Sequence, residues 1–274
     1  MRALLVAASL SILLALNAYQ YFGSREPVGA SGSDPAAAKP ATEARTPDEV
    51  KQAVLAALSR DEVRDLFQQL FDREKLVVKN RWFGVPTFQH PFDVWIQQEI
   101  IFEVAPDFIV ETGTHRGGSA GLWAMLLEHT NPDGRVISID IVDRRTEAHL
   151  SLPLVKQRVD FLLGDAADPK IVEEVARRVE GKKVLVILDD AKDPDHILAE
   201  LEAYAPLVSL GSYLIVQGTH LGYRVLQWRG PAWAPGAYEG VQRFMARSDQ
   251  FVIDSSRERL IATESPDGFL KRIR

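Results

Sequence analysis

The chain has 274 residues, a formal net charge of −6, 26% charged residues and 46% hydrophobic residues. These values fit a globular domain with added segments, and an acidic chain offers no overall basic surface for nucleic acid. The chain contains no cysteine. This excludes disulfides, thiolate zinc sites and cysteine nucleophiles, and it leaves the redox compartment undetermined.

Residues 1–22 are predicted to form an N-terminal membrane anchor. Residues 3–18 are almost all apolar, and with the aromatic residues up to Phe22 the stretch is about long enough to cross a bilayer as a helix. A cleaved signal peptide is the alternative, because Arg2 supplies a positive start, although the following residues match a cleavage site poorly. Residues 23–45 are rich in Gly, Ser, Pro and Ala, which is typical of a flexible linker.

Residues 46–80 are predicted to be a helical extension. Thr-Pro-Asp-Glu at 46–49 and Ser-Arg-Asp-Glu at 59–62 both have the pattern of a capping box. Apolar residues at helical spacing follow each box. The sequence therefore predicts one helix after each box, and the two helices are expected to pack as an α-hairpin against the main domain.

Strands and helices alternate in the rest of the chain. Five short runs rich in apolar and β-branched residues lie at 108–111, 136–140, 159–163, 184–188 and 213–216. Segments of helical composition separate most of them, at 119–128, 171–179 and 195–204. This alternation predicts right-handed βαβ units and a mainly parallel, Rossmann-like α/β sheet that is covered on both faces.

The chain ends in two further β-rich runs, at 251–254 and 259–263. Only four residues separate them, which leaves no room for a crossover helix. They are therefore predicted to pair as a terminal antiparallel hairpin.

The first strand leads into a glycine-rich turn, Glu-Thr-Gly-Thr-His-Arg-Gly-Gly-Ser at 111–119. Gly113 and Gly117 permit a tight turn that a ligand can approach closely, and Ser119 can cap the next helix. The His and Arg of this turn could orient a ligand carboxylate. The pattern is neither Gly-x-Gly-x-x-Gly nor a P-loop, which disfavours dinucleotides and nucleoside triphosphates.

Acidic residues follow the next two strands. Asp140 ends the second strand, and Asp165 follows the third. Ligands of open α/β sheets bind beyond the carboxyl ends of the strands. A carboxylate at 140 could accept both hydroxyls of a ribose, and one at 165 could meet an adenine amine.

Several motifs beyond residue 81 resemble the cephalosporin hydroxylase and rhamnosyl O-methyltransferase family. They are Trp-Phe-Gly-Val-Pro at 82–86, Pro-Phe-Asp-Val-Trp at 91–95, Gln-Glu-Ile at 98–100, Glu-Thr-Gly at 111–113, Gly-Gly-Ser at 117–119, Ile-Ser-Ile-Asp at 137–140, His-Ile-Leu-Ala-Glu-Leu at 196–201, Tyr-Ala-Pro-Leu-Val at 204–208, Gly-Ser-Tyr-Leu-Ile-Val at 211–216 and Gly-Phe-Leu-Lys-Arg at 268–272. The resemblance spans residues 81–274 and excludes the predicted anchor and linker.

This resemblance implies a class I methyltransferase fold over 81–274 and S-adenosylmethionine (SAM) as cofactor. It also implies that Glu111, Gly113 and Ser119 line the methionine part of the cofactor. By the same resemblance, Asp140 holds the ribose and Asp165 lies at the adenine.

The chain departs from this family at the motifs that supply a divalent-metal site. The usual Asp-Ser-x-His after the fourth strand reads Asp-Asp-Ala-Lys at 189–192, and the usual Glu-Asp-Thr after the fifth strand reads Gln-Gly-Thr at 217–219. Asp189 is kept, and with Asp190 or Asp193 it could still hold Mg²⁺, which prefers oxygen ligands. The family geometry is nevertheless lost.

Catalysis without a metal requires another group to remove the acceptor proton. Asp189 is the first candidate, and His220, just past the fifth strand, could act as a general base. Lys192 could do so only if burial lowered its pKa substantially. The loop at 223–238, with its Trp, Gly and Pro residues, is predicted to cover the acceptor.

Together these features predict a SAM-dependent O-methyltransferase that acts on a hydroxyl of a sugar or another small metabolite. The alternative is a SAM-binding or scaffold protein of the same fold that has lost catalysis. Because SAM is made in the cytosol, the enzyme hypothesis predicts an anchored domain that faces the cytoplasm, with export as the alternative.

Overall fold

The computed structural model of the protein describes residues 46–57, 59–220 and 235–274. The predicted anchor, the predicted linker and most of the predicted covering loop lie outside the described residues. Within the described ranges, no helix combines the length and apolar character needed to span a bilayer.

The chain divides into two units, residues 1–52 and 53–274, with the boundary inside the first described helix. The helices of the N-terminal extension are α2 (Pro47–Ala57), α3 (Arg60–Arg73) and the 3₁₀ helix η1 (Val77–Lys79). Both predicted capping boxes form. The backbone N–H groups of Thr46 and Ser59 donate to the carboxylates of Glu49 and Glu62, at 2.6 and 2.7 Å.

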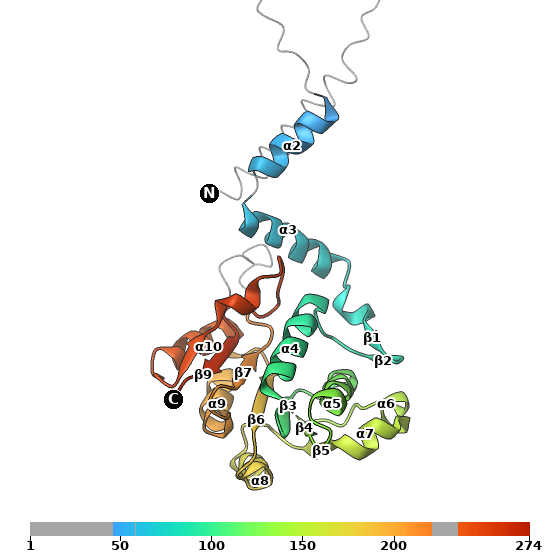
Figure 1. The fold of residues 1–274 in the computed structure, drawn as a ribbon, viewed down its shortest axis with the longest axis vertical. Coiled ribbons are helices and arrows are strands. Elements are labelled where there is room, and N and C mark those ends of the chain that lie inside the picture. The colour runs from blue at the N-terminus through green and yellow to red at the C-terminus, as the bar shows by residue number, and fades with distance from the viewer. Residues whose placement is uncertain (1–45, 58, 221–234) are drawn as a thin grey trace, which may run out of the picture. The chain divides into compact units, whose positions relative to one another are not determined.

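The second unit contains a seven-stranded sheet with the order β5-β4-β3-β6-β7-β9-β8 (Figure 1). Its strands are β3 (Phe108–Thr112), β4 (Arg135–Asp140), β5 (Val159–Leu163), β6 (Val184–Leu188), β7 (Tyr213–Val216), β8 (Phe251–Ile253) and β9 (Phe269–Arg272). The first five pair in parallel, and β9 joins antiparallel to both β7 and β8. The predicted α/β fold with a terminal antiparallel pair is confirmed.

The predicted partner within that antiparallel pair is wrong. Residues 259–263 form no strand, and β8 pairs instead with β9. After β8 the chain turns into the 3₁₀ helix η5 (Ser255–Glu258). The segment then packs toward helix α4 (Pro91–Val104), where Glu264 N donates to the buried Asp93 Oδ2 at 2.8 Å. Tertiary contacts therefore override the β propensity of this segment.

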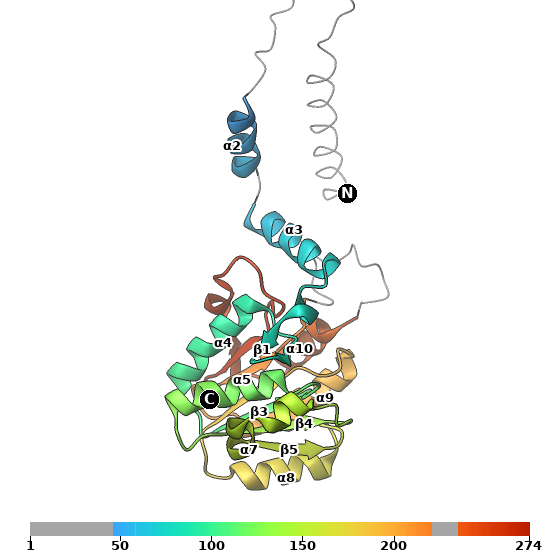
Figure 2. The same ribbon diagram turned by 90° about the vertical axis from the view of Figure 1, so that its right-hand side faces the viewer.

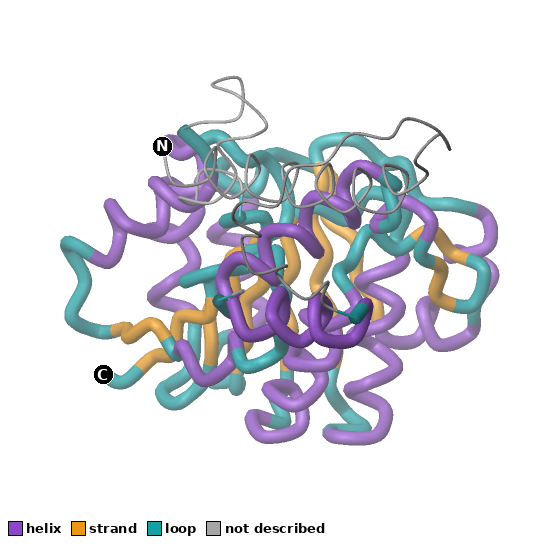
Figure 3. Tube along the Cα trace, turned by 90° about the horizontal axis from the view of Figure 1, so that it is seen from above, coloured by secondary structure: helices purple, strands orange, loops and turns teal. Residues whose placement is uncertain are grey.

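The two faces of the sheet are covered by different helices (Figures 2 and 3). The helices are α4 (Pro91–Val104), α5 (Gly118–Thr130), α6 (Glu147–Ser151), α7 (Pro153–Arg158), α8 (Pro169–Val179), α9 (Pro194–Tyr204), the 3₁₀ helix η2 (Ala205–Leu207) and α10 (Ala237–Met245). A hydrophobic core lies on each face of the sheet, and successive residues of one strand point into opposite cores. Val186 and Leu188 of β6 pack with α8, α9 and α10, whereas Leu185 and Ile187 pack with α4, α5 and α7. A short hairpin, β1 (Arg81–Trp82) with β2 (Val85–Pro86), was not predicted.

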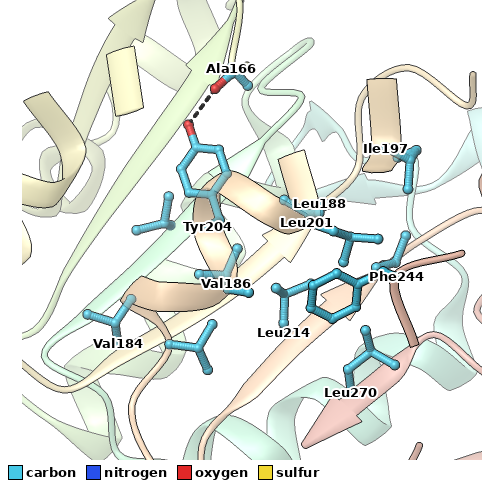
Figure 4. Packing of buried hydrophobic residues seen from close by; sticks show 14 of the residues in the cluster. Ala166, Val184, Val186, Leu188, Ile197, Leu201, Tyr204, Leu214, Phe244 and Leu270 are labelled. Carbon is cyan, nitrogen blue, oxygen red and sulfur yellow. Dashed lines mark hydrogen bonds between the residues drawn. The ribbon is translucent and has the colours of Figure 1, made fainter. Parts of the chain in front are cut away.

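Figure 4 shows the core beneath α9 and α10, in which Leu188, Leu201 and Phe244 pack together. Fully burying an aliphatic or aromatic side chain of this kind stabilises a fold by about 1.5–3 kcal/mol. Tyr204 adds a polar contact, because its hydroxyl donates to the Ala166 carbonyl oxygen at 2.9 Å. The core thereby fixes the turn that follows β5, next to Asp165.

Candidate active site

Two neighbouring cavities lie at the carboxyl ends of the parallel strands, where an open α/β sheet binds its ligands. The first measures about 360 Å³ and the second about 280 Å³. Asp140, Ile141, Asp190 and Ala191 line both. The cavities therefore adjoin and together run from the glycine-rich turn to the turn after β5, a shape that suits an elongated ligand.

The glycine-rich turn after β3 forms one wall of the first cavity. Gly113 and Gly117 have φ angles of 88° and 87°, a region that only glycine enters without strain. Gly113 lines the cavity, and a Cβ there would collide with the Asp189 carbonyl oxygen. Gly117 is not among the lining residues; a Cβ there would instead collide with the ring of His149. Its part in the turn is conformational.

Glu111 lies beneath the turn, fully buried, and is not among the lining residues of either cavity. It accepts hydrogen bonds from Trp123 Nε1 at 2.8 Å and from Ser138 Oγ at 2.6 Å, and Thr114 Oγ1 lies 2.6 Å from the same Ser138 oxygen. Burial raises the pKa of Glu111 to about 7, against the lowering effect of these hydrogen bonds. Glu111 therefore contacts side chains beneath the turn and supports the shape of the turn.

Asp140 is at the junction of the two cavities. Its Oδ2 accepts from His115 N at 2.7 Å and its Oδ1 from Val142 N at 3.0 Å, so the carboxylate is fixed by the backbone on both sides. Asp165 lines the second cavity, and its Oδ1 accepts from Ala167 N at 2.9 Å. The structure therefore brings both predicted carboxylates to one continuous groove.

The amino end of α5 and basic side chains of the loops after β3 and β4 form the rest of the wall of the first cavity. Ser119 lines it at the amino end of α5, as do His115, Arg116 and Arg144. The His115 ring packs against Phe88 with centroids 4.6 Å apart. Burial, followed by the charges of Arg116 and Arg144, lowers the pKa of His115, so that the two arginines supply the positive charge.

Asp189 follows β6 and lines the first cavity beside Gly113. Lys192 Nζ lies 3.0 Å from its Oδ1, and Gln89 Nε2 donates to its Oδ2 at 2.9 Å. Gln217 Nε2 in turn donates to Gln89 Oε1 at 2.8 Å. Burial raises the pKa of Asp189, and the neighbouring Lys192 opposes that rise. These four residues are called the Asp189 centre below.

His220 is buried after β7, and its Nδ1 lies 2.9 Å from the Glu264 carbonyl oxygen. A ring that donates from Nδ1 to this carbonyl leaves Nε2 as an acceptor, which a general base requires. Neither His220 nor Lys192 is among the lining residues of the two cavities. Of the three predicted catalytic residues, only Asp189 lines either of these two cavities, as far as the described residues show.

The Asp189 centre does not fit a Mg²⁺ ion. Asp190, which could have joined Asp189 as a ligand, has its Oδ2 3.1 Å from His196 Nε2, and within the described ranges its ligand atoms group with those of His196 and Glu200 instead of Asp189. Asp193 caps α9, where its Oδ1 accepts from two backbone N–H groups. Asp189 is left with an ammonium and an amide N–H as its partners, and these donors cannot ligate a cation.

Sequence reasoning missed Phe88, Gln89 and Arg144. Phe88 and Gln89 lie in an irregular segment between β2 and α4, and Arg144 lies in the loop after β4. Hydrophobic periodicity does not single out residues in irregular segments. The one sequence signal for Gln89 was its place between the family motifs at 82–86 and 91–95.

A sheet of this strand order, with a groove across the ends of β3, β4 and β5 and an acid fixed at the end of β4, defines a class I SAM-dependent methyltransferase. The predicted SAM fits the groove, because cationic, carboxylate and glycine positions follow one another along it.

The chain belongs to the Rhamnosyl O-methyltransferase/CmcI family, whose model matches residues 74–273. It is 30% identical over 199 residues to a rhamnosyl O-methyltransferase of Mycobacterium leprae, covering 70% of this chain and 82% of that protein. It is 29% identical over 220 residues to one of Mycobacterium tuberculosis H37Rv, covering 77% and 86%. The resemblance predicted from the motifs is confirmed, and the protein is a SAM-dependent methyltransferase.

Solved structures support the same fold. A structure of CmcI with Mg and SAM superposes with a TM-score of 0.55 at 20% identity, covering 72% of this chain and 78% of that one. An apo structure of CmcI gives a TM-score of 0.54 at the same identity, covering 72% and 77%.

Proposed function

We propose that the protein transfers the methyl group of SAM to a hydroxyl group of a sugar or of a similarly small hydroxylated metabolite. The observation that carries the proposal is the groove along the strand ends, with Asp140 fixed at its middle and Asp189 at its end. The rhamnosyl O-methyltransferases that the chain resembles support a sugar as acceptor.

The groove offers a partner for each part of the cofactor. Arg116 and Arg144 can pair with the methionine carboxylate, and Ser119 lies at the amino end of α5, which favours a negative group. Asp140 can accept the ribose hydroxyls, and Asp165 can accept from the adenine amine. Glu111, Gly113 and Gly117 act by shaping the turn.

When bound, SAM supplies a methyl group on a positively charged sulfur. The acceptor oxygen bonds to this carbon as the C–S bond breaks, with the electron pair left on sulfur, so the chain must hold the acceptor in line and take its hydroxyl proton. Asp189 lines the groove, and burial favours its binding a proton, so we assign it this role. His220 Nε2 is the second candidate base, and Lys192 is assigned no proton transfer.

The N-terminal segment completes the proposal. We infer from the apolar residues 3–18 that it anchors the chain in a membrane, with the methyltransferase domain in the cytosol, where SAM is made. Protease treatment of spheroplasts tests this orientation. The domain should resist digestion until the membrane is permeabilised, and digestion in intact spheroplasts would contradict the inference.

The test of the proposed function is a transfer assay with labelled SAM, the full chain and a panel of sugars, glycosides and phenols. Incorporation of label into a sugar hydroxyl that depends on Asp189 is the expected result. SAM binding without transfer to any acceptor would instead support the alternative of a degenerate SAM-binding or scaffold protein.

A further inference from the structure

Lys192 is held in the Asp189 centre by more than one contact. Its Nζ lies 3.0 Å from Asp189 Oδ1, and the two side chains are only 25% and 20% exposed. The other carboxylate oxygen accepts from Gln89. Both oxygens of Asp189 are thus engaged by donors, and a metal ion would have to displace a paired, largely buried ammonium to reach them.

The lysine stem fills the space beside Gly218. A Cβ at residue 218 would lie 2.5 Å from Lys192 Cε and 2.9 Å from its Cδ. A carboxylate side chain at 218 and the observed Lys192 conformation therefore exclude each other. Lys192 can adopt this conformation because residue 218 is a glycine, so the two residues depend on each other in packing.

The polarity of the hydrogen bonds likewise requires a donor at 217. The ionised carboxylate of Asp189 can only accept, so in this form Gln89 directs its NH₂ group to Asp189 and its oxygen to residue 217. Residue 217 must then donate, which Gln217 does at 2.8 Å and an ionised glutamate could not. Positions 192, 217 and 218 therefore form one interlocking set around Asp189.

The surroundings also call for a positive charge at this place. Asp93 is buried and Glu264 is half-buried nearby, and Glu264 interacts electrostatically with Asp189 and Asp93 as well as with Lys192. A group of carboxylates in a dry environment is stable only with a compensating cation or with bound protons. Lys192 is the cation that the fold itself brings to this group.

We propose that the Lys192 ammonium is the resident cation of the Asp189 centre and occupies the place that a divalent metal would take. This inference rests on the proposed function, because it makes methyl transfer at this centre independent of divalent metal. Lys192 acts as a positioning residue: it fixes the Asp189 carboxylate and balances its charge.

The test measures Mn²⁺ binding to the full chain by electron paramagnetic resonance, which needs no acceptor. The wild-type Asp189 centre should bind no Mn²⁺ tighter than about 1 mM. The triple variant Lys192→His, Gln217→Glu, Gly218→Asp restores carboxylate and imidazole ligands, and its affinity should be at least about tenfold higher. Adding Asp189→Asn to the triple variant should abolish the gain.

A second variant keeps the test decisive if the triple variant does not fold. Lys192→Met leaves Asp189 without its cation and should lower the melting temperature by about 5 °C or more. Mn²⁺ should recover part of this loss in Lys192→Met and should leave the wild type unchanged. The matched control Lys156→Met removes an exposed lysine and should melt as the wild type does.

Wild-type Mn²⁺ binding that Asp189→Asn weakens tenfold or more would overturn the proposal. Wild-type binding that Asp189→Asn leaves intact supports the proposal, because the ion then lies elsewhere. Two other groups of residues have ligand atoms within 4.8 Å of one another, namely Asp72–His220–Glu264 and Asp190–His196–Glu200. A failure of the proposed function would appear separately, as absent transfer in the acceptor panel.

Discussion

The two ends of the groove differ in how their residues relate to the family. At the cofactor end, Gly113 and Asp140 lie in family motifs, Asp165 follows the next strand, and all three line the groove. At the Asp189 end, Lys192, Gln217 and Gly218 depart from the family together: Lys192 pairs with Asp189 and packs beside Gly218, and Gln217 is linked to Asp189 through Gln89. The departures from the family motifs are thus concentrated around Asp189.

The largest expected effect concerns the cofactor end. Asp140→Ala removes a carboxylate that holds the turn through His115 N and is available to the ribose. Losing charge-assisted hydrogen bonds worth about 3 kcal/mol should weaken SAM binding about 100-fold in a calorimetric titration. The control Asp143→Ala removes a nearby carboxylate that pairs with Arg145 and should bind SAM normally. Unchanged affinity in Asp140→Ala would show that SAM binds elsewhere.

His90 provides a pH test of the protein next to Gln89. Its ring is buried among Phe67, Phe71 and Phe92, and neither ring nitrogen has a hydrogen-bond partner within the described ranges. Burial lowers its pKa to about 4. Between about pH 6.5 and 4 the unfolded chain binds the extra proton, so stability is lost as the pH falls through this range.

The His90→Phe variant should lack this loss, which reaches about 3 kcal/mol at pH 4. Denaturant unfolding of both proteins at several pH values measures the difference. His129→Phe, which changes an exposed ring, is the control and should follow the wild type. Parallel profiles for His90→Phe and the wild type would mean that the His90 ring reaches water in the native state.

Gly113→Ala tests the close contact between the glycine-rich turn and the backbone of Asp189. Its Cβ would collide with the Asp189 carbonyl oxygen at a φ of 88°, so we expect a stability loss of about 2–3 kcal/mol together with weaker SAM binding. Gly181→Ala is the matched control, because its φ of 69° is also positive but its Cβ meets open space. It should cost about 1 kcal/mol. Equal losses in the two variants would contradict the close contact at Gly113.

Tyr204→Phe has the smallest expected effect. It removes the hydrogen bond to the Ala166 carbonyl and leaves the aromatic packing in place, at a cost of about 1 kcal/mol in thermal or denaturant unfolding. A neutral result would indicate that the turn after β5 holds its position without this contact.

The sequence could predict the sheet and the cofactor end, because both depend on local patterns. Apolar runs marked β3 to β7, and an acid that directly follows a parallel strand must lie at the ligand-binding edge, as Asp140 and Asp165 do. Gly113 could be predicted for the same reason, because it directly follows β3.

The remaining features depend on contacts between distant segments. Residues 259–263 have strand composition, but the segment packs toward α4 through Asp93. Gln89 meets Asp189 across 100 positions of sequence, and no periodicity announces such a pair. The lysine at 192 could be identified as a departure from the family, but its dependence on the space beside Gly218 required the folded arrangement.

The most direct test of the account is a calorimetric titration of SAM into the full chain after treatment with EDTA, repeated with added Mg²⁺. An intact cofactor end beside a centre whose cation is Lys192 predicts the same affinity in both titrations. Binding that appears only with Mg²⁺ would contradict the account, because the Asp189 centre would then require a metal that its present ligands do not fit.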